Sequence, residues 1–103
     1  MREFWRLLYE AGADVVVSGH DHLYERFAPQ DMDGRPDPSR GIRQFVAGTG
    51  GADLYAHVSM QPNSEVQIST FGVLKFTLSA DSYEWEFVPV SGGKRDAGRA
   101  MCH

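Results

Sequence analysis

A run of valines at positions 15–17 constrains the fold of this 103-residue chain more than any other feature. The run is apolar without alternation, as in a strand of a parallel sheet that is buried on both faces. We therefore predict a buried strand over residues 14–18. A segment with helical periodicity, residues 2–11, precedes it, and Gly12 is placed to end that helix in the left-handed conformation. Helix, turn and buried strand form half of an α/β unit.

The predicted helix carries two apolar stripes. The first has the spacing i, i+3, i+4 and i+7 that defines one helix face, and it consists of Phe4, Leu7, Leu8 and Ala11. The second stripe consists of Trp5 and Tyr9. Because one sheet needs only one covering face, we interpret the second stripe as a sign that this helix packs against more protein.

Residues 72–88 have the clearest alternating pattern in the chain. Apolar side chains alternate with polar ones on both sides of a short polar loop, which predicts a β-hairpin. A loop of two or four residues sets Phe76 opposite Trp85 and Lys75 opposite Glu86. The aromatic residues then share the buried face, and the opposite charges lie outside.

The rest of the chain is less strongly patterned. We expect an extended segment over 24–28, a loop over 29–41 and a strand over 42–47, whereas residues 52–70 show only a weak pattern. The polar tail, residues 91–103, is expected to be loosely held, with His103 mobile at its end. The predicted fold class is therefore α/β, as an α+β fragment: one N-terminal helix feeding a buried strand, then a mostly antiparallel sheet with a C-terminal hairpin.

Composition excludes several classes of function. The net charge is −4, so a nucleic-acid binder or a polybasic membrane patch is not indicated. No apolar run approaches the roughly 20 residues that span a bilayer, and the first residues do not resemble a signal peptide. Cys102 is the only cysteine, so no internal disulfide can form. A single cysteine does not identify the cellular compartment of the protein.

Two histidines, His20 and His22, follow the predicted strand after Gly19. Neutral imidazole is a common ligand of zinc, iron and related metals. In an extended backbone, residues i and i+2 point the same way about 6.6 Å apart, so each ring can reach a different ion of a pair about 3.5–4 Å apart. Gly19 leaves room for the backbone to leave the strand. We expect Asp21 to point away from the metals, where its carboxylate either makes a hydrogen bond near them or is solvated. The alternative interpretation of the two histidines is that they are solvated loop residues that bind no metal.

Two further features admit more than one interpretation. Residues 48–51, Gly-Thr-Gly-Gly, either cradle a phosphate or form a tight turn, and no P-loop lysine follows them. His57 is either a third ligand or substrate contact, or a solvated loop residue. The aspartates of the 31–37 loop lack an EF-hand spacing, so calcium binding is not indicated.

The segment Gly-His-Asp-His-Leu-Tyr-Glu-Arg, residues 19–26, resembles the C-terminal metal motif of the calcineurin-like metallophosphoesterases. Its Tyr-Glu-Arg extension is similar to the purple acid phosphatase-like branch. The stretch 45–51, the 72–88 hairpin and the ending at 96–103 also resemble that branch. The resemblance spans nearly the whole chain, although only the His-Xaa-His pair is chemically specific.

The resemblance implies two stacked mixed sheets flanked by helices and a centre of two metal ions (Fe, Zn or Mn) that hydrolyses a phosphate ester. It implies His20 as a ligand of one ion and His22 as a ligand of the other. It also implies that Gly50 lies on the substrate side, and it is compatible with a secreted complete protein.

The family's other metal motifs, which carry the bridging carboxylate, an asparagine ligand and the acid–base histidine, have no counterpart before Gly19. We therefore interpret residues 1–103 as the C-terminal part of a metallophosphoesterase catalytic domain, whose catalytic residues lie upstream and whose partner is the missing N-terminal part. This chain alone is expected to be inactive and to bind at most a single metal weakly. The alternative is a non-catalytic, β-rich interaction or weak metal-binding module.

Overall fold

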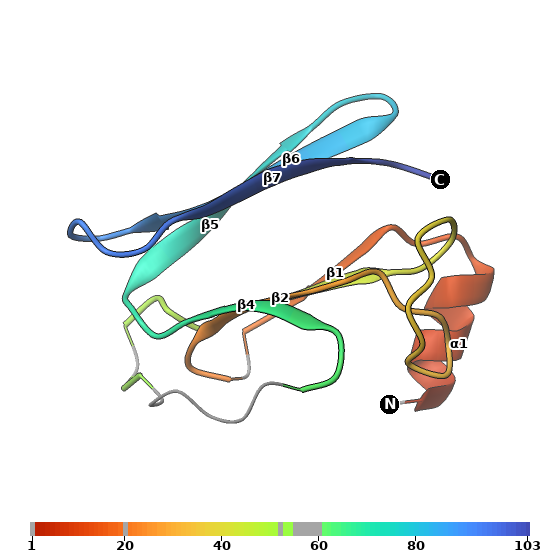
Figure 1. Cartoon of the computed structure of the whole chain (residues 1–103), viewed down its shortest axis with the longest axis horizontal. Coiled ribbons are helices and arrows are strands. Elements are labelled where there is room, and N and C mark those ends of the chain that lie inside the picture. The colour runs from red at the N-terminus through yellow and green to blue at the C-terminus, as the bar shows by residue number, and fades with distance from the viewer. Residues whose placement is uncertain (1, 20, 52, 55–60) are drawn as a thin grey trace.

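The computed structural model describes residues 2–19, 21–51, 53–54 and 61–103 (Figure 1). The fold is α+β, with one short helix and two sheets of mixed and antiparallel strands. The helix lies against the first sheet on the side away from the second sheet. Within these ranges, no helix is long and apolar enough to cross a membrane.

The helix α1 (Arg2–Glu10) ends as the sequence predicts. Gly12 has a φ of 82° and its N–H donates to the carbonyl of Tyr9 at 3.1 Å. This is the left-handed conformation that glycine adopts at low cost. The chain then enters β1 (Val15–Ser18), so the predicted helix–turn–strand unit is confirmed.

The first sheet has the strand order β1-β3-β2-β4, where β2 is Tyr24–Phe27, β3 is Arg43–Ala47 and β4 is Ser64–Ile68. β1 runs parallel to β3, as its valines predict, and the other pairs are antiparallel. The prediction that β1 is buried on both faces is wrong for this chain. Among the described strands β1 lies at the edge of its sheet, and Val17 is 51% exposed.

The second sheet consists of β5 (Gly72–Leu78), β6 (Ser82–Pro89) and β7 (Asp96–Met101) in that order. The hairpin prediction is confirmed in its register, since Phe76 pairs with Trp85 and Lys75 pairs with Glu86. The strands thus form a sheet of their own instead of extending the first one.

Part of the tail that we expect to be loosely held, residues 91–103, forms a strand in the structure. β7 pairs with β6 over its whole length, and Asp96 is buried. His103, expected to be mobile, donates its backbone N–H to Asp14 at 2.9 Å, and its Nε2 lies 2.9 Å from the carbonyl oxygen of Gly41. These long-range partners have no signature in the tail itself.

The core lies between the two sheets. It consists of Tyr24, Phe45 and Ile68 from the first sheet and Tyr83, Trp85 and Phe87 from the second. Tyr24 stacks on Phe87 with 4.5 Å between ring centroids, and Phe45 meets the edge of Trp85 at 5.5 Å. Burial of these rings supplies the main stabilisation of the two-sheet packing.

The two stripes of α1 have exchanged the roles expected from the sequence. Trp5 Nε1 donates to the Asp31 carbonyl at 3.1 Å, and the Tyr9 hydroxyl donates to the Asp37 carboxylate at 2.6 Å. The second stripe therefore hydrogen-bonds to the 29–41 loop of this same chain. Phe4 and Leu7 of the first stripe are 55% and 52% exposed, so the uncovered face is the one expected to lie on the sheet.

Candidate metal-ligand site

The turn that carries His22 lies at the carboxyl end of β1. Because β1 and β3 are parallel, with Ser18 beside Val46, residues 48–51 after β3 leave the sheet at the same edge. Ligands of sheets with parallel strands commonly bind at that edge. The structure therefore brings together the two sequence segments that we singled out for metal and substrate contacts.

Gly48 holds this turn in place. Its N–H donates to the Leu23 carbonyl at 3.0 Å, and a Cβ added at Gly48 would overlap the Asp21 carbonyl oxygen. Only glycine allows this approach of two backbones. At Gly19, where we expected the steric need, an added Cβ would lie 3.6 Å from the Ala47 carbonyl oxygen, an ordinary contact. The need for glycine is therefore stronger at Gly48.

His22 is oriented by a backbone carbonyl. Its Nδ1 lies 2.8 Å from the carbonyl oxygen of Asp53. A carbonyl oxygen only accepts, so Nδ1 carries the hydrogen and the lone pair of the neutral ring is on Nε2. Metal-binding histidines have this polarity, because the bond at one nitrogen orients the ring and fixes the tautomer. The sequence gives no sign of the Asp53 contact, which joins residues 31 positions apart.

The other predicted site residues are placed as follows. His20 and His57 lie outside the described residues. Asp21 is exposed, and its carbonyl accepts from the Leu23 N–H at 2.9 Å, so its backbone shapes the turn. Gly50 is exposed beside this turn, and a Cβ added there meets nothing within 4 Å.

Thr49 anchors the second segment to the opposite sheet. It is 2% exposed, and its Oγ1 donates to the Gly72 carbonyl at 2.9 Å. In return, the Gly72 N–H donates to the Thr49 carbonyl at 3.1 Å. This pair of bonds favours the tight-turn interpretation of residues 48–51 and ties the edge of the candidate site to β5. Sequence reasoning treated the glycines as the important residues and missed Thr49.

The ligand set is incomplete in the described part of the chain. Among those residues, no three His, Cys, Asp or Glu side chains lie close enough together to hold a metal ion. The polarity of His22 fits a metal ligand, but a catalytic metal ion takes about three protein ligands. The described residues therefore do not make a catalytic centre by themselves.

The chain was compared with models of known protein families, with curated proteins and with solved structures, and none of the three comparisons finds a match. The functional assignment therefore depends on the sequence motif and on the geometry of the turn after β1. Of the described residues, His22 and Gly48 carry that geometry.

Proposed function

We propose that this chain supplies two histidine ligands, His20 and His22, to the dinuclear metal centre of a calcineurin-like phosphoric-ester hydrolase of the purple acid phosphatase-like branch. When bound, two such ions (Fe, Zn or Mn) activate a water for attack on phosphorus and neutralise the phosphoryl oxygens. The contribution of this chain is to hold the imidazoles at the carboxyl end of β1.

The hydrogen bond between His22 Nδ1 and the Asp53 carbonyl is the observation that carries this proposal. A solvated loop histidine needs no such partner, whereas a ligand gains from having its tautomer fixed before the metal arrives. Gly48 adds to this by clamping the backbone on either side of Asp21.

The remaining ligands and the acid–base groups come from another part of the hydrolase. Two imidazoles make a weak site for one ion, and activation of a water for hydrolysis also needs a carboxylate or further ligands around it. We therefore expect that the 103-residue chain does not hydrolyse p-nitrophenyl phosphate in the presence of Mn²⁺, Zn²⁺ or Fe²⁺. Turnover well above that of a His22→Ala variant would contradict the proposed division of the site.

Metal titration of the full chain tests the ligand assignment. Co²⁺ gives a visible spectrum when it binds imidazole nitrogen, so its affinity is measurable directly. We expect His20→Ala and His22→Ala each to weaken Co²⁺ binding by about tenfold or more. His103→Ala is the matched control, because His103 contacts Asp14 and Gly41 beyond the opposite end of β1. Equal losses in all three variants would contradict the assignment.

One observation favours the second candidate, a non-catalytic interaction module. Phe4 and Leu7 of α1 are exposed, and exposed apolar patches mark surfaces for other proteins. The same Co²⁺ titration separates the two functions. A folded chain that binds no metal at His20 and His22 would favour the module over the hydrolase.

A further inference from the structure

Two contacts that position His22 come from one stretch of chain, the segment between Gly48 and Asp53. Gly48 packs on the carbonyl group of Asp21, the residue directly before His22. The carbonyl oxygen of Asp53 lies 2.8 Å from Nδ1 of His22 and orients the ring. The position of His22 therefore depends on where this segment lies.

Glycine gives the first part of that segment a wide choice of conformations. Positions 48, 50 and 51 are glycine, and Gly51 has a φ of 145°. Glycine populates both signs of φ, so the unrestrained turn has much conformational freedom to lose. Thr49 is the only residue of the 48–51 turn with a side chain beyond a hydrogen atom. It is therefore the only one whose side chain can fix the turn.

The first residue of β5, Gly72, holds that side chain. Oγ1 of Thr49 donates to the Gly72 carbonyl at 2.9 Å, and the Gly72 N–H donates to the Thr49 carbonyl at 3.1 Å. Gly72 is in close contact with β6, since a Cβ added there would lie 2.5 Å from the Val88 carbonyl oxygen and 2.8 Å from the Phe87 ring. The two hydrogen bonds therefore join Thr49 to a tightly packed point of the second sheet.

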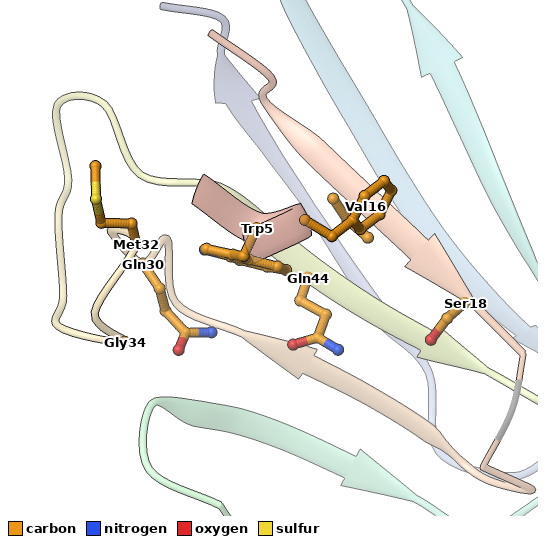
Figure 2. Close-up of a pocket in the computed structure, with 8 residues that line it drawn as sticks. Trp5, Val16, Ser18, Gln30, Met32, Gly34 and Gln44 are labelled. Atoms are coloured by element: carbon orange, nitrogen blue, oxygen red, sulfur yellow. The ribbon is translucent and has the colours of Figure 1, made fainter. Parts of the chain in front are cut away.

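The chain that leads into the turn borders open space on the α1 side of the first sheet. Ser18, the last residue of β1, lines a pocket of about 360 Å³ there, together with Val16 and Gln44 (Figure 2). Packing against α1 therefore does not enclose the end of β1. This increases the importance of the contacts that the 48–51 turn makes with the second sheet.

We propose that Thr49 is a positioning residue for His22, and that the second sheet sets the geometry of the candidate metal-ligand site through it. Thr49 holds the 48–51 turn, and the segment that begins there fixes the Asp21 backbone and the Nδ1 hydrogen of His22. Strands β5 to β7 contain none of the predicted ligands. The inference rests on the proposed function insofar as His22 is a ligand, whereas the orientation of its ring can be measured without metal.

Three variants of the full chain separate positioning from general stability. Thr49→Val keeps a branched side chain but has no hydroxyl, whereas Thr49→Ser keeps the hydroxyl. Gly98→Ala is the stability control, because its new methyl group overlaps the Trp85 ring and does not touch Thr49. Co²⁺ affinity and the ring tautomer of His22, from ¹H–¹⁵N NMR, are measured where circular dichroism shows each variant to be folded.

We expect Thr49→Val to weaken Co²⁺ binding by about tenfold, the lower end of the effect of groups that orient a metal ligand. It should also lower the fraction of His22 rings with the hydrogen on Nδ1. Thr49→Ser and Gly98→Ala should keep both properties of the wild type. Wild-type affinity and tautomer in Thr49→Val would overturn the role of Thr49, as would losses of the same size in Thr49→Ser or Gly98→Ala.

Hydrogen exchange of the wild-type chain tests the anchor even where Thr49→Val does not fold. The N–H groups of Gly48 and Gly72 both donate to backbone carbonyls at the anchor. They should exchange as slowly as the N–H of Phe45 in the core of β3, within about tenfold. Exchange of both groups at the rate of an unprotected amide would overturn the proposal.

Failure of the proposed function has a different signature. A wild-type chain whose Co²⁺ affinity is unaffected by His20→Ala and His22→Ala would contradict the ligand assignment. If Thr49→Val still changes the His22 tautomer in the metal-free chain, the positioning role of Thr49 is supported and the proposed function alone is contradicted.

Discussion

Gly48 packs so closely on the carbonyl group of Asp21 that no side chain fits between them. This contact joins the end of β3 to the turn that carries the two histidines, and the Gly48 N–H bond to Leu23 closes it on the other side. The turn that leads to His22 is therefore fixed by a backbone contact between the segments that follow two neighbouring parallel strands.

We expect Gly48→Ala to destabilise the protein by about 1–3 kcal/mol, as overpacking usually does, because the new methyl group meets backbone that cannot rotate away. Urea unfolding measures this free energy. Gly50→Ala is the matched control, since a Cβ there meets nothing within 4 Å, and its effect should stay within about 0.5 kcal/mol. Comparable losses for both variants would show that the contact with Asp21 is not the cause.

The Asp96 carboxylate links the two sheets. It accepts from Arg26 Nε at 2.7 Å and from the Tyr24 hydroxyl at 2.5 Å. Burial alone would raise the pKa of Asp96, but the hydrogen bonds from Arg26 and Tyr24 and the charge of Arg26 hold this pKa below its ordinary value. The folded state therefore favours the ionised form more than the unfolded state does.

The pH dependence follows from that sign. The stabilisation from Asp96 is complete above the unfolded pKa of about 3.9 and is lost as the pH falls through the lower folded value. Asp96→Asn should cost about 1.5–3 kcal/mol at pH 7, and its difference from the wild type should shrink below about pH 4. Urea unfolding at several pH values measures both. An unchanged difference at low pH would contradict this account, and Glu84→Gln, at an exposed site, serves as the control.

Gly98 of β7 makes room for the ring of Trp85. A Cβ at Gly98 would overlap that ring, and the ring is also covered by the guanidinium groups of Arg26 and Arg43 at 5.2 and 4.9 Å from its centroid. Gly98→Ala should therefore destabilise the protein by about 1–3 kcal/mol and change the near-ultraviolet signal of Trp85. Ala97→Ser, at the exposed neighbouring position, should change neither.

The elements that the sequence predicts well are those whose partners are close along the chain. The 72–88 hairpin has a register fixed by a short loop and alternating aromatics, and α1 ends at a glycine. β7 and β4 depend instead on partners that are distant along the chain. The residues of β7 are mostly small or polar, so its sequence predicts neither its pairing with β6 nor the hydrogen bonds of Asp96. β4 was missed because its alternation is short and begins just after a turn at Asn63.

The same distinction applies to the candidate site. The His-Xaa-His pair after a valine strand could be found from the sequence, because the chemistry is carried by adjacent residues. Asp53, Thr49 and the steric role of Gly48 could not, since each acts through a contact with a segment more than twenty residues away. The sequence pattern does not show which stripe of α1 is covered, because the loop residue that contacts Trp5 lies 26 positions further along the chain.

Long-range ¹H–¹⁵N NMR of the histidine rings, recorded with and without Zn²⁺, tests the central claim most directly, because it reports the tautomer of each ring and the nitrogen that binds metal. We predict that His22 has its hydrogen on Nδ1 before Zn²⁺ is added and that Zn²⁺ then shifts the Nε2 resonances of His20 and His22, while those of His103 stay unchanged. A His22 ring with its hydrogen on Nε2, or a Zn²⁺ response at His103 alone, would contradict the account.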